Sequence, residues 1–345
     1  MKLLNKVIKI HLLYNYLKIS KSERQKLNSL ERNNISETFL KNYFGDENFE
    51  RLFLAADASF RRYELITSLN QKYVLMDAPP VQEKLDEFIQ IDQLLLKLNL
   101  SSPEIYHIDR QNGFLLMEYL GDKKLNKIKN KVETECYIES LNLLVKLKNN
   151  YADYKQENIP KYSKDILIKE SELFFDWYVI QEKNYLKDDY NIIISNLIDK
   201  LEIKQEVLTL RDYHADNILW LDDRSAIERV GLLDFQDALI GNPAYDVVSL
   251  LEDARKDVPD QLAEKCISHY IEKSELNEAE FLNDYYILGA QRNLKIIGIF
   301  SRLAKRDGKT HYLEMIPRVK NYLLNDLKHP TLLELKIFLE ENRLI

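Results

Sequence analysis

The chain has 345 residues, of which 45% are apolar and 30% charged, a balance typical of a folded protein large enough for two lobes of one catalytic unit. Its net charge of −7 gives no electrostatic support for nucleic-acid binding. The two cysteines, Cys136 and Cys266, fall in helix-like segments and are predicted to be packed thiols rather than a disulfide framework.

No apolar run is long enough for a membrane span, and lysines interrupt the N-terminus where a signal peptide would be continuously apolar. We therefore expect a cytoplasmic protein with access to ATP. Its expected partners include neither nucleic acid nor a membrane, and the sequence leaves the oligomeric state open.

The first 50 residues are rich in lysine and asparagine. Leu3, Leu4, Val7, Ile10 and Leu13 recur at helical spacing, which predicts one or two amphipathic helices. Packing on a small lobe is the simpler interpretation of these helices, and a partner-binding extension is the alternative.

Residues 51–78 are predicted to form strands separated by a polar turn, Asp57–Tyr63. Ser59, Arg61 and Arg62 in this turn are groups that can hold a phosphate. The alternative is a plain hairpin with two solvated arginines. The chain has only eight glycines and no glycine-rich loop, so phosphate would have to be held by groups of this kind.

More elements follow in order: a strand, a helix and a strand pair, at residues 72–77, 83–98, 103–108 and 113–120. Glu83 or Glu87, in the first turns of the helix, could occupy an inward position, but no lysine partner is evident and we expect each to be solvated. From residue 123 to residue 206 the apolar residues recur at three- and four-residue steps, which predicts a helical region.

Two apolar, strand-like runs between residues 208 and 233 each end in an acid. Asp212 follows the first run, Asn217 comes five positions later, and Asp234 follows the second run. Phosphoryl transfer from ATP needs one carboxylate to orient and deprotonate a hydroxyl, and hard oxygen ligands to hold Mg²⁺. The alternative is that the two acids cap loops and the amide occupies a turn. The combination is rare enough by chance to favour phosphoryl transfer.

The stretch Arg211–Asn217 resembles the catalytic loop of protein-kinase-like enzymes, with Leu210 in place of the histidine of that motif. Leu233–Gln236 stands where their Asp-Phe-Gly motif would be, with Gln236 in place of glycine. These departures, together with Asn242–Ser249 downstream, resemble the aminoglycoside phosphotransferase family of small-molecule kinases.

A narrower resemblance rests on three stretches, Asp57–Tyr63, Val74–Pro80 and Leu233–Asp237. They are similar to the anomeric sugar kinases, which phosphorylate N-acetylmuramate and N-acetylglucosamine at C1 in cell-wall recycling. Met76 stands where protein kinases have a phosphate-binding lysine, and the sugar kinases look the same at this position.

The resemblance implies an α+β, two-lobed protein-kinase-like fold with a small β-rich N-lobe and a larger helical C-lobe. It divides the chain into an N-terminal helical extension, a nucleotide-binding N-lobe and a C-lobe with the catalytic loop, metal site and substrate pocket, at residues 1–50, 51–120 and 121–345. It also implies ATP and Mg²⁺ as cofactors.

The resemblance assigns roles to individual residues. Asp212 receives the proton of the anomeric hydroxyl, Asn217 and Asp234 hold Mg²⁺, and Asp237 lies within reach of a sugar hydroxyl. Asp246 either caps the helix that follows or braces the catalytic loop. The expected nucleotide-binding residues are Ser59, Arg61 and Arg62 at the phosphates, and Met117, Glu118 and Leu120 near the adenine.

A helix predicted over Leu288–Lys309 places four cations within an arc of about 80°, namely Arg292, Lys295, Arg302 and Arg306. Such a stripe is either a solvated edge or the lining of a cleft for an anionic ligand. We expect Arg292 to meet an anionic or strongly hydrogen-bonding part of the sugar.

Two rival functions remain at this point. One is a kinase of the same fold that acts on an aminoglycoside, choline or another amine, which calls for an acidic pocket rather than a cationic stripe. The other is a non-catalytic nucleotide-binding protein, which Met76, Leu210 and the scarcity of glycine favour. The intact Asp212, Asn217 and Asp234 argue against it.

Overall fold

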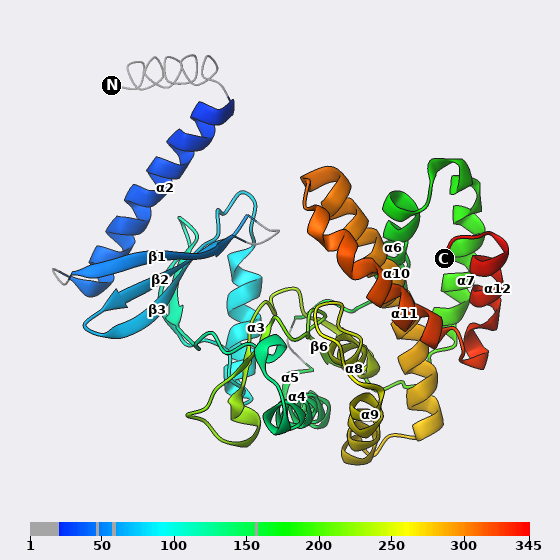
Figure 1. Cartoon of the computed structure of the whole chain (residues 1–345). Helices are drawn as coiled ribbons and strands as arrows, with labels where there is room; N and C mark the ends of the chain where they lie inside the picture. The colour runs from blue at the N-terminus through cyan, green and yellow to red at the C-terminus, as the bar shows by residue number, and fades with distance from the viewer. Residues whose placement is uncertain (1–20, 46–47, 57–59, 156–157) are drawn as a thin grey trace. The chain divides into compact units, whose positions relative to one another are not determined.

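The structure is a computed structural model that describes residues 21–45, 48–56, 60–155 and 158–345. Its chain forms two compact units (Figure 1). The first unit ends at Leu85 and takes in a later segment, Glu104–Tyr119, and the second consists of Asp86–Pro103 and Leu120–Ile345. The helix after the third strand belongs with the second unit.

An antiparallel sheet of five strands, in the order β1-β2-β3-β5-β4, is the centre of the first unit. Its strands are β1 (Phe49–Ala56), β2 (Arg62–Ser68), β3 (Gln71–Asp77), β4 (Ile105–Asp109) and β5 (Phe114–Glu118). Leu69 and Asn70 connect β2 to β3, with φ of 48° and 62°. Positive φ at both central residues is what a two-residue type I′ hairpin requires, so this turn fixes the register of β2 against β3.

Helix α2 (Lys21–Phe44) packs on one face of this sheet. Its Phe39 and Phe44 are buried in an apolar cluster with strand residues Ile66, Leu75, Phe114 and Leu116. Arg32 Nε donates to Asp77 Oδ1 at 2.8 Å and so ties the helix to the end of β3. The described part of the N-terminal extension therefore packs within its own unit. The helix expected at residues 3–13 lies outside the described residues.

The other face of the sheet carries an apolar row. Leu52, Leu65, Val74 and Met117 are successive cross-strand partners on β1, β2, β3 and β5. Because side chains alternate along a strand, this row points away from Leu75 and α2. Leu52 is 63% exposed and Met117 only 3%, so the row runs from the open edge of the sheet into the interior.

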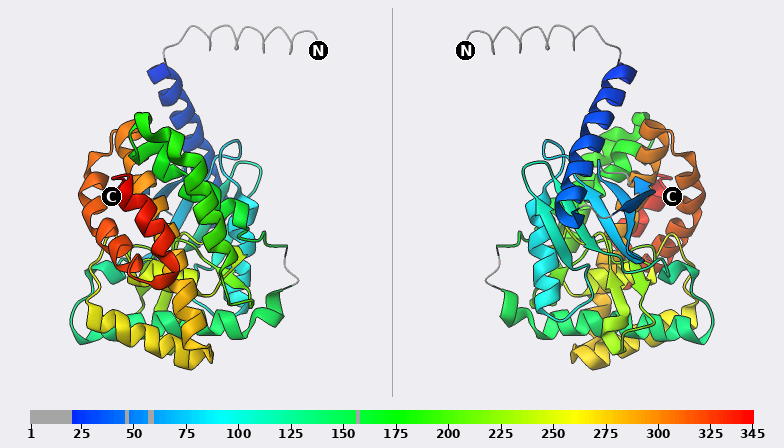
Figure 2. Two further views of the ribbon diagram at one scale, coloured as in Figure 1. Left: turned by 90° about the vertical axis from the view of Figure 1, so that its right-hand side faces the viewer. Right: turned by 90° about the vertical axis from the view of Figure 1, so that its left-hand side faces the viewer.

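The second unit is mostly helical (Figures 1 and 2). Its α-helices are α3 (Leu85–Lys97), α4 (Lys131–Asn149), α5 (Tyr151–Tyr154), α6 (Lys164–Ser171), α7 (Lys187–Asp199), α8 (Ala244–Leu251), α9 (Asp260–Ser274), α10 (Glu278–Asp307), α11 (Ile316–Asp326) and α12 (Leu333–Glu341). Shorter helical turns are η1 (Leu125–Lys127), the π-helix η2 (Phe174–Tyr178), η3 (Gln181–Leu186), η4 (Ala226–Arg229), η5 (Thr310–Met315) and η6 (Pro330–Leu332).

The 30-residue helix α10 packs against α6, α8, α11 and η2. It begins at Asn277, whose side-chain oxygen accepts from the Glu280 N–H at 3.1 Å, and it ends at Gly308, whose φ of 69° is a conformation that glycine adopts without strain. In its middle, a Cβ on Gly298 would lie 2.2 Å from the carbonyl carbon of Leu173. Only glycine therefore allows α10 to approach the start of η2 this closely.

Two short ladders bring distant loops together. Their strands are β6 (Val207–Thr209) with β9 (Leu239–Gly241), and β7 (Ile218–Trp220) with β8 (Val230–Leu232). The residues of β6, β7 and β8 are all buried, as the apolar runs predict. Loop 210–217 leaves β6 and loop 233–238 leaves β8, and the Leu233 N–H donates to the Asn217 carbonyl at 2.9 Å. The two loops that carry the motif residues therefore run side by side.

The cysteine expectation is confirmed. Cys136 on α4 and Cys266 on α9 are buried free thiols, and burial raises the pKa of each to about 12. In the part of the chain that the structure describes, no helix has both the length and the apolar composition needed to cross a membrane.

Candidate active site

The three residues that the sequence assigns to phosphoryl transfer lie together. The Asn217 amide nitrogen donates to the main-chain oxygen of Asp212 at 3.1 Å and to Asp234 Oδ2 at 3.4 Å. Asp212 is exposed, whereas Asn217 and Asp234 are half-buried. One carboxylate is thus open to an incoming hydroxyl, while the amide and the second carboxylate face each other beside it.

Asn217 and Asp234 have the chemistry of a magnesium site. The hydrogen bonds above engage Asn217 through its nitrogen, and they leave its amide oxygen unused. An amide oxygen and a carboxylate are hard ligands that Mg²⁺ accepts, with phosphate oxygens and water completing its octahedron. Among the described residues, no group of three or more His, Cys, Asp and Glu is arranged to hold a metal. Two oxygen ligands of this kind suit an ion whose remaining ligands are phosphate oxygens and water.

Gln236, at the place of the motif's glycine, orients two acids. Its Nε2 donates to Asp234 Oδ1 at 2.8 Å and to Asp237 Oδ2 at 3.3 Å. Asp234 has a left-handed backbone with φ of 56°, which costs a non-glycine residue roughly 1–2 kcal/mol. The neighbouring Phe235 is buried and stacks on Phe88 of α3 with ring centroids 5.0 Å apart. These contacts hold the strained turn in one conformation.

Asp246 braces the catalytic loop, which decides between its two expected roles. Its carboxylate accepts from the main-chain N–H of Leu210 at 2.6 Å and of Arg211 at 2.9 Å. Asp246 itself lies in the first turn of α8, whose first residue, Ala244, donates its N–H to Asn242 Oδ1 at 2.9 Å. Arg211 has φ of 70°, so the two hydrogen bonds stabilise a backbone conformation that is unfavourable by itself. Burial raises the pKa of Asp246 to about 7, although both hydrogen bonds act to lower it.

A largely buried ion-pair network includes Arg211, the residue before Asp212. The Arg211 guanidinium pairs with Glu170 of α6, donates to the Asp237 carbonyl at 3.0 Å, and lies 5.2 Å above the Tyr162 ring. Lys295 of α10 also reaches Glu170, at 2.8 Å. Burial alone would raise the pKa of Glu170, but the two cations outweigh it and lower that pKa. Glu170 is therefore a carboxylate that anchors Arg211, the residue before Asp212.

Most of this network could not be predicted from the sequence. Glu170 lies in a helical stretch about forty residues before Arg211, and Tyr162 lies in the loop before that helix. A single glutamate on an otherwise ordinary helix carries no signal of its own. Of the network residues, Arg211 stands out in the sequence as part of the loop motif and Lys295 as part of the cationic stripe, but nothing in the sequence links them to each other.

Arg292 corrects an expectation. It is buried, with 3% of its surface exposed; its Nη2 donates to Ser249 Oγ at 2.8 Å, and its Nη1 to the Glu252 carbonyl at 3.5 Å. Ser249 Oγ in turn donates to the Arg211 carbonyl at 3.2 Å. The helix periodicity was correct, but this side of α10 faces α8 rather than a cleft. Arg292 is thus placed to support the catalytic loop from behind instead of contacting a sugar.

The rest of the stripe is not a uniform solvated edge either. Lys295 is largely buried against Glu170, whereas Arg306 is exposed and forms hydrogen bonds of 2.7 and 2.8 Å with Asp307. Arg302 is half-buried. The four cations share one side of the helix but have four different surroundings, because that side passes from the core to the surface along its length.

In the first unit, Arg61 forms an ion pair that the sequence did not predict. Its Nε lies 3.0 Å from Glu83 Oε2, and each of the two side chains is only 9% exposed. Glu83 Oε1 also accepts from the Phe60 N–H at 2.9 Å. The expectation of a solvated Glu83 is therefore wrong, and Arg61 is not a solvated hairpin arginine. Arg62 is exposed at the start of β2, while Ser59 lies outside the described residues.

The residues expected near adenine occupy the end of the last strand. Met117 is buried in β5, at the interior end of the apolar row, and Glu118 is the final residue of that strand. Leu120, two residues on, is half-buried. Met76, in the place of the usual strand lysine, is fully buried in β3.

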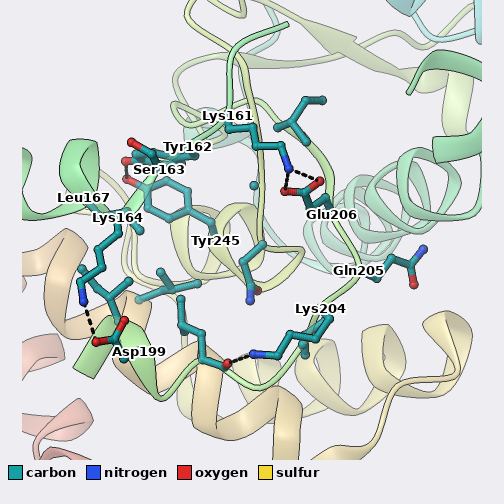
Figure 3. Close-up of a pocket in the computed structure, with 17 residues that line it drawn as sticks. Lys161, Tyr162, Ser163, Lys164, Leu167, Asp199, Lys204, Gln205, Glu206 and Tyr245 are labelled. Atoms are coloured by element: carbon teal, nitrogen blue, oxygen red, sulfur yellow. Dashed lines mark hydrogen bonds and ion pairs between the residues drawn. The ribbon is translucent and has the colours of Figure 1, made fainter. Parts of the chain in front are cut away.

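A separate cavity of about 440 Å³ opens in the second unit (Figure 3). Its wall includes Tyr162 and Tyr245, and its rim carries two ion pairs, Lys161 with Glu206 at 2.8 Å and Lys164 with Asp199 at 2.6 Å. None of Asp212, Asn217 and Asp234 lines it. The cavity is therefore distinct from the cluster formed by Asp212, Asn217 and Asp234.

Comparison with known proteins adds to this geometry. Residues 50–282 match the model of the phosphotransferase enzyme family. The N-acetylmuramate/N-acetylglucosamine kinase of Caulobacter vibrioides is 31% identical, over 90% of this chain and 97% of its own. The enzyme of the same name from Pseudomonas putida is 32% identical, over 87% of this chain and 91% of its own.

Among solved structures, the GDP complex of aminoglycoside 2'-phosphotransferase-IIIa has a TM-score of 0.60 at 16% identity and covers 84% of this chain and 98% of its own. At this identity the likeness shows the fold alone, and it confirms the expected two-lobed, protein-kinase-like α+β fold. The family match covers the sheet of the first unit and both motif loops of the second. The chain accordingly belongs to the phosphotransferase enzyme family and is a small-molecule kinase.

Proposed function

We propose that the protein transfers the γ-phosphoryl group of ATP to the anomeric hydroxyl of N-acetylmuramate, N-acetylglucosamine or both, in a Mg²⁺-dependent reaction. The product is the sugar 1-phosphate, and the proposed role is peptidoglycan recycling in the cytoplasm, where ATP is available. The observation that carries the proposal is the hydrogen-bonded cluster of Asp212, Asn217 and Asp234. The names of the two relatives narrow the acceptor to these amino sugars.

In this reaction Asp212 is the base. The C1 hydroxyl of a free sugar is more acidic than an ordinary alcohol, so a carboxylate of moderate basicity is enough to accept its proton. The hydroxyl oxygen forms a bond to the γ-phosphorus, the bond from that phosphorus to the ADP oxygen breaks, and the proton passes to Asp212. Asp237, exposed on the adjoining loop, accepts a hydrogen bond from a ring hydroxyl common to both sugars.

Asn217 and Asp234 would hold the magnesium ion, which neutralises charge on the ATP phosphates when it is bound. The contribution of the chain is to fix these ligands in advance. Gln236 and Asn217 each donate to a different oxygen of the Asp234 carboxylate, at 2.8 and 3.4 Å. Positioning of this kind lowers the reorganisation that the reaction needs.

Arg61 is our proposed substitute for the missing strand lysine. In protein kinases a β3 lysine binds the phosphates and is held by a helix glutamate. Here Met76 leaves that place apolar, and the Arg61–Glu83 pair supplies a cation held by a glutamate from a neighbouring stretch of chain. Arg62 and Ser59 remain predicted phosphate contacts beside it.

The apolar row of the first unit fits the base of the nucleotide. Leu52, Leu65, Val74 and Met117 form a continuous strip on the sheet face away from α2. A strip of this kind suits the flat, apolar faces of adenine, while main-chain groups near Glu118 and Leu120 supply hydrogen bonds to its edge.

A transfer assay tests the proposal. The purified protein is incubated with γ-labelled ATP, Mg²⁺ and one acceptor at a time from a panel of N-acetylmuramate, N-acetylglucosamine, an aminoglycoside and choline. We expect label transfer to at least one of the two sugars, with phosphorus bonded at C1 by NMR, and none to the amines. Transfer to an amine instead, phosphate at another sugar carbon, or ATP consumption that no acceptor changes would each contradict the proposal.

A further inference from the structure

Three of the four cations on the stripe of α10 have hydrogen-bond or ion-pair partners inside the protein. Arg292 donates to Ser249 Oγ and to the Glu252 carbonyl, Lys295 is paired with Glu170, and Arg306 is paired with Asp307. Arg302 differs from them. Its Nε is buried, and within the described residues no hydrogen-bond acceptor lies within reach of that atom.

The electrostatic surroundings of Arg302 leave its charge poorly compensated. Burial and the like charge of Arg306 lower its pKa, and only Asp307 acts in the opposite direction. Asp307 is already engaged by Arg306 through two hydrogen bonds. A half-buried guanidinium in this situation gains from an external anion, because its fork of donors matches a carboxylate.

Arg302 lies at the seam between α10 and the π-helix η2. It comes four residues after Gly298, which touches the start of η2, and three before Lys305, whose ammonium donates to the Trp177 carbonyl. Positions spaced in this way share one face of a helix. The same seam carries half-buried aromatic side chains, Trp177 and Tyr178. π-Helices are rare and often occur at functional sites.

The seam is also connected to the catalytic loop. Lys295 reaches Glu170 at 2.8 Å, and Glu170 pairs with Arg211, the residue before Asp212. Arg302 follows Lys295 by seven residues, which is two turns and roughly 10 Å along the same side of the helix. Arg302 thus shares a side of α10 with the lysine of the ion-pair network next to Asp212.

We propose that Arg302 is the anion-binding residue of the acceptor site and selects N-acetylmuramate over N-acetylglucosamine. The two sugars differ by a lactyl group that carries a carboxylate and is attached two ring carbons away from C1. The guanidinium of Arg302 binds this carboxylate in N-acetylmuramate and has no such partner in N-acetylglucosamine. The inference rests on the proposed function and adds a specificity-determining residue to it.

The test compares kcat/KM for the two sugars in the same preparation of Arg302→Gln. A charge-assisted hydrogen bond corresponds to roughly a ten- to hundredfold change in kcat/KM. We expect the ratio of N-acetylmuramate to N-acetylglucosamine to fall by this factor, mainly through KM, while the rate with N-acetylglucosamine changes less than about twofold. Because both sugars are measured on one sample, a partly unfolded variant leaves the ratio unaffected.

Two further variants complete the design. Arg306→Gln removes the same charge one turn further on, from an exposed residue already paired with Asp307, and should leave the ratio unchanged. Arg302→Lys keeps the charge without the planar fork and should restore part of the ratio. An unchanged ratio in Arg302→Gln, or an equal fall in Arg306→Gln, would overturn the inference while leaving the kinase proposal intact. If the unmodified protein phosphorylates neither sugar, both proposals fail.

Discussion

The substitution Asp246→Asn perturbs the brace of the catalytic loop. Asp246 accepts two main-chain N–H groups, from Leu210 and Arg211, at 2.6 and 2.9 Å. Asparagine has one acceptor oxygen and one donor nitrogen, so it leaves one of these buried N–H groups unpaired. An unpaired buried donor costs about 1–3 kcal/mol of folding free energy.

The effect of this substitution depends on pH. Burial raises the pKa of Asp246 from 3.8 to about 7 in the folded protein. The folded state therefore holds the proton more tightly than the unfolded state. The stability that this proton contributes is complete below about pH 4 and is lost as the pH rises through about 7. Linkage gives a loss of about 3 kcal/mol between pH 5 and pH 8 from this one group.

Asparagine has no proton to lose, so the stability of the variant should not fall in this way as the pH rises. At pH 5 the carboxyl of Asp246 is protonated and, like asparagine, has one carbonyl oxygen, so the variant and the unmodified protein should differ by less than about 1–3 kcal/mol. From pH 5 to pH 8 the unmodified protein should lose about 3 kcal/mol of stability relative to the variant. Urea unfolding followed by tryptophan fluorescence measures it, since both tryptophans, Trp177 and Trp220, lie in the second unit.

The exposed Asp223→Asn provides the control and should leave the pH profile as it is. If Asp246→Asn and the unmodified protein lose stability in parallel from pH 5 to pH 8, Asp246 does not carry the raised pKa and the reasoning is refuted.

Three other predictions concern the proposed metal-binding residues, the proposed phosphate-binding arginine and the buried Arg292. Asp234→Ala should abolish turnover and weaken Mg²⁺-dependent nucleotide binding, with Asn217→Ala a milder form of the same defect; a normal Mg·ATP titration of Asp234→Ala would exclude it as a metal ligand. Arg61→Ala should raise the KM for ATP by roughly ten- to a hundredfold, since it removes a charge-assisted contact; an unchanged KM would show that phosphate is held elsewhere. Arg292→Ala should lower kcat equally for both sugars and lower the melting temperature, because it removes a buried support; a selective loss on N-acetylmuramate would return Arg292 to the acceptor site.

Asp212, Asn217 and Asp234 could be selected as candidates from the sequence because the pattern that marks them is local. Asp212 and Asn217 lie five residues apart on one loop, and the strand-like runs before Asp212 and Asp234 reveal where each loop begins. The packing of buried strands then forces the two loops together, as the hydrogen bond between Leu233 and Asn217 shows. A motif of this kind therefore predicts both which residues are involved and which loops lie next to each other.

Partners that are distant in sequence were beyond such reasoning. Glu170 and Arg211 are 41 residues apart, and nothing in either stretch selects the other. The Arg61–Glu83 pair was equally unpredictable, because Glu83 pairs with an arginine just before β2 rather than with a lysine on β3. In both cases the pairing follows from how the chain packs rather than from the spacing of residues.

The stripe on α10 shows the limit of helical periodicity. Periodicity correctly placed Arg292, Lys295, Arg302 and Arg306 on one side of a helix within Glu278–Asp307. It fixes the angles among them but not which neighbouring element that side meets at each turn. Packing against α8 buries Arg292, and the seam with η2 leaves Arg302 as the cation whose charge is least compensated.

The central claim is that the loop carrying Asp212 transfers phosphate to the C1 hydroxyl of an amino sugar. The most direct measurement is the kcat of Asp212→Asn with N-acetylmuramate and N-acetylglucosamine, alongside calorimetric titration of Mg·ATP into the same variant. Asparagine keeps the shape of the side chain and removes its ability to accept a proton. We expect kcat to fall by about 10²–10⁴-fold with ATP affinity nearly unchanged. Turnover close to that of the unmodified protein, in a variant that binds Mg·ATP normally, would contradict it.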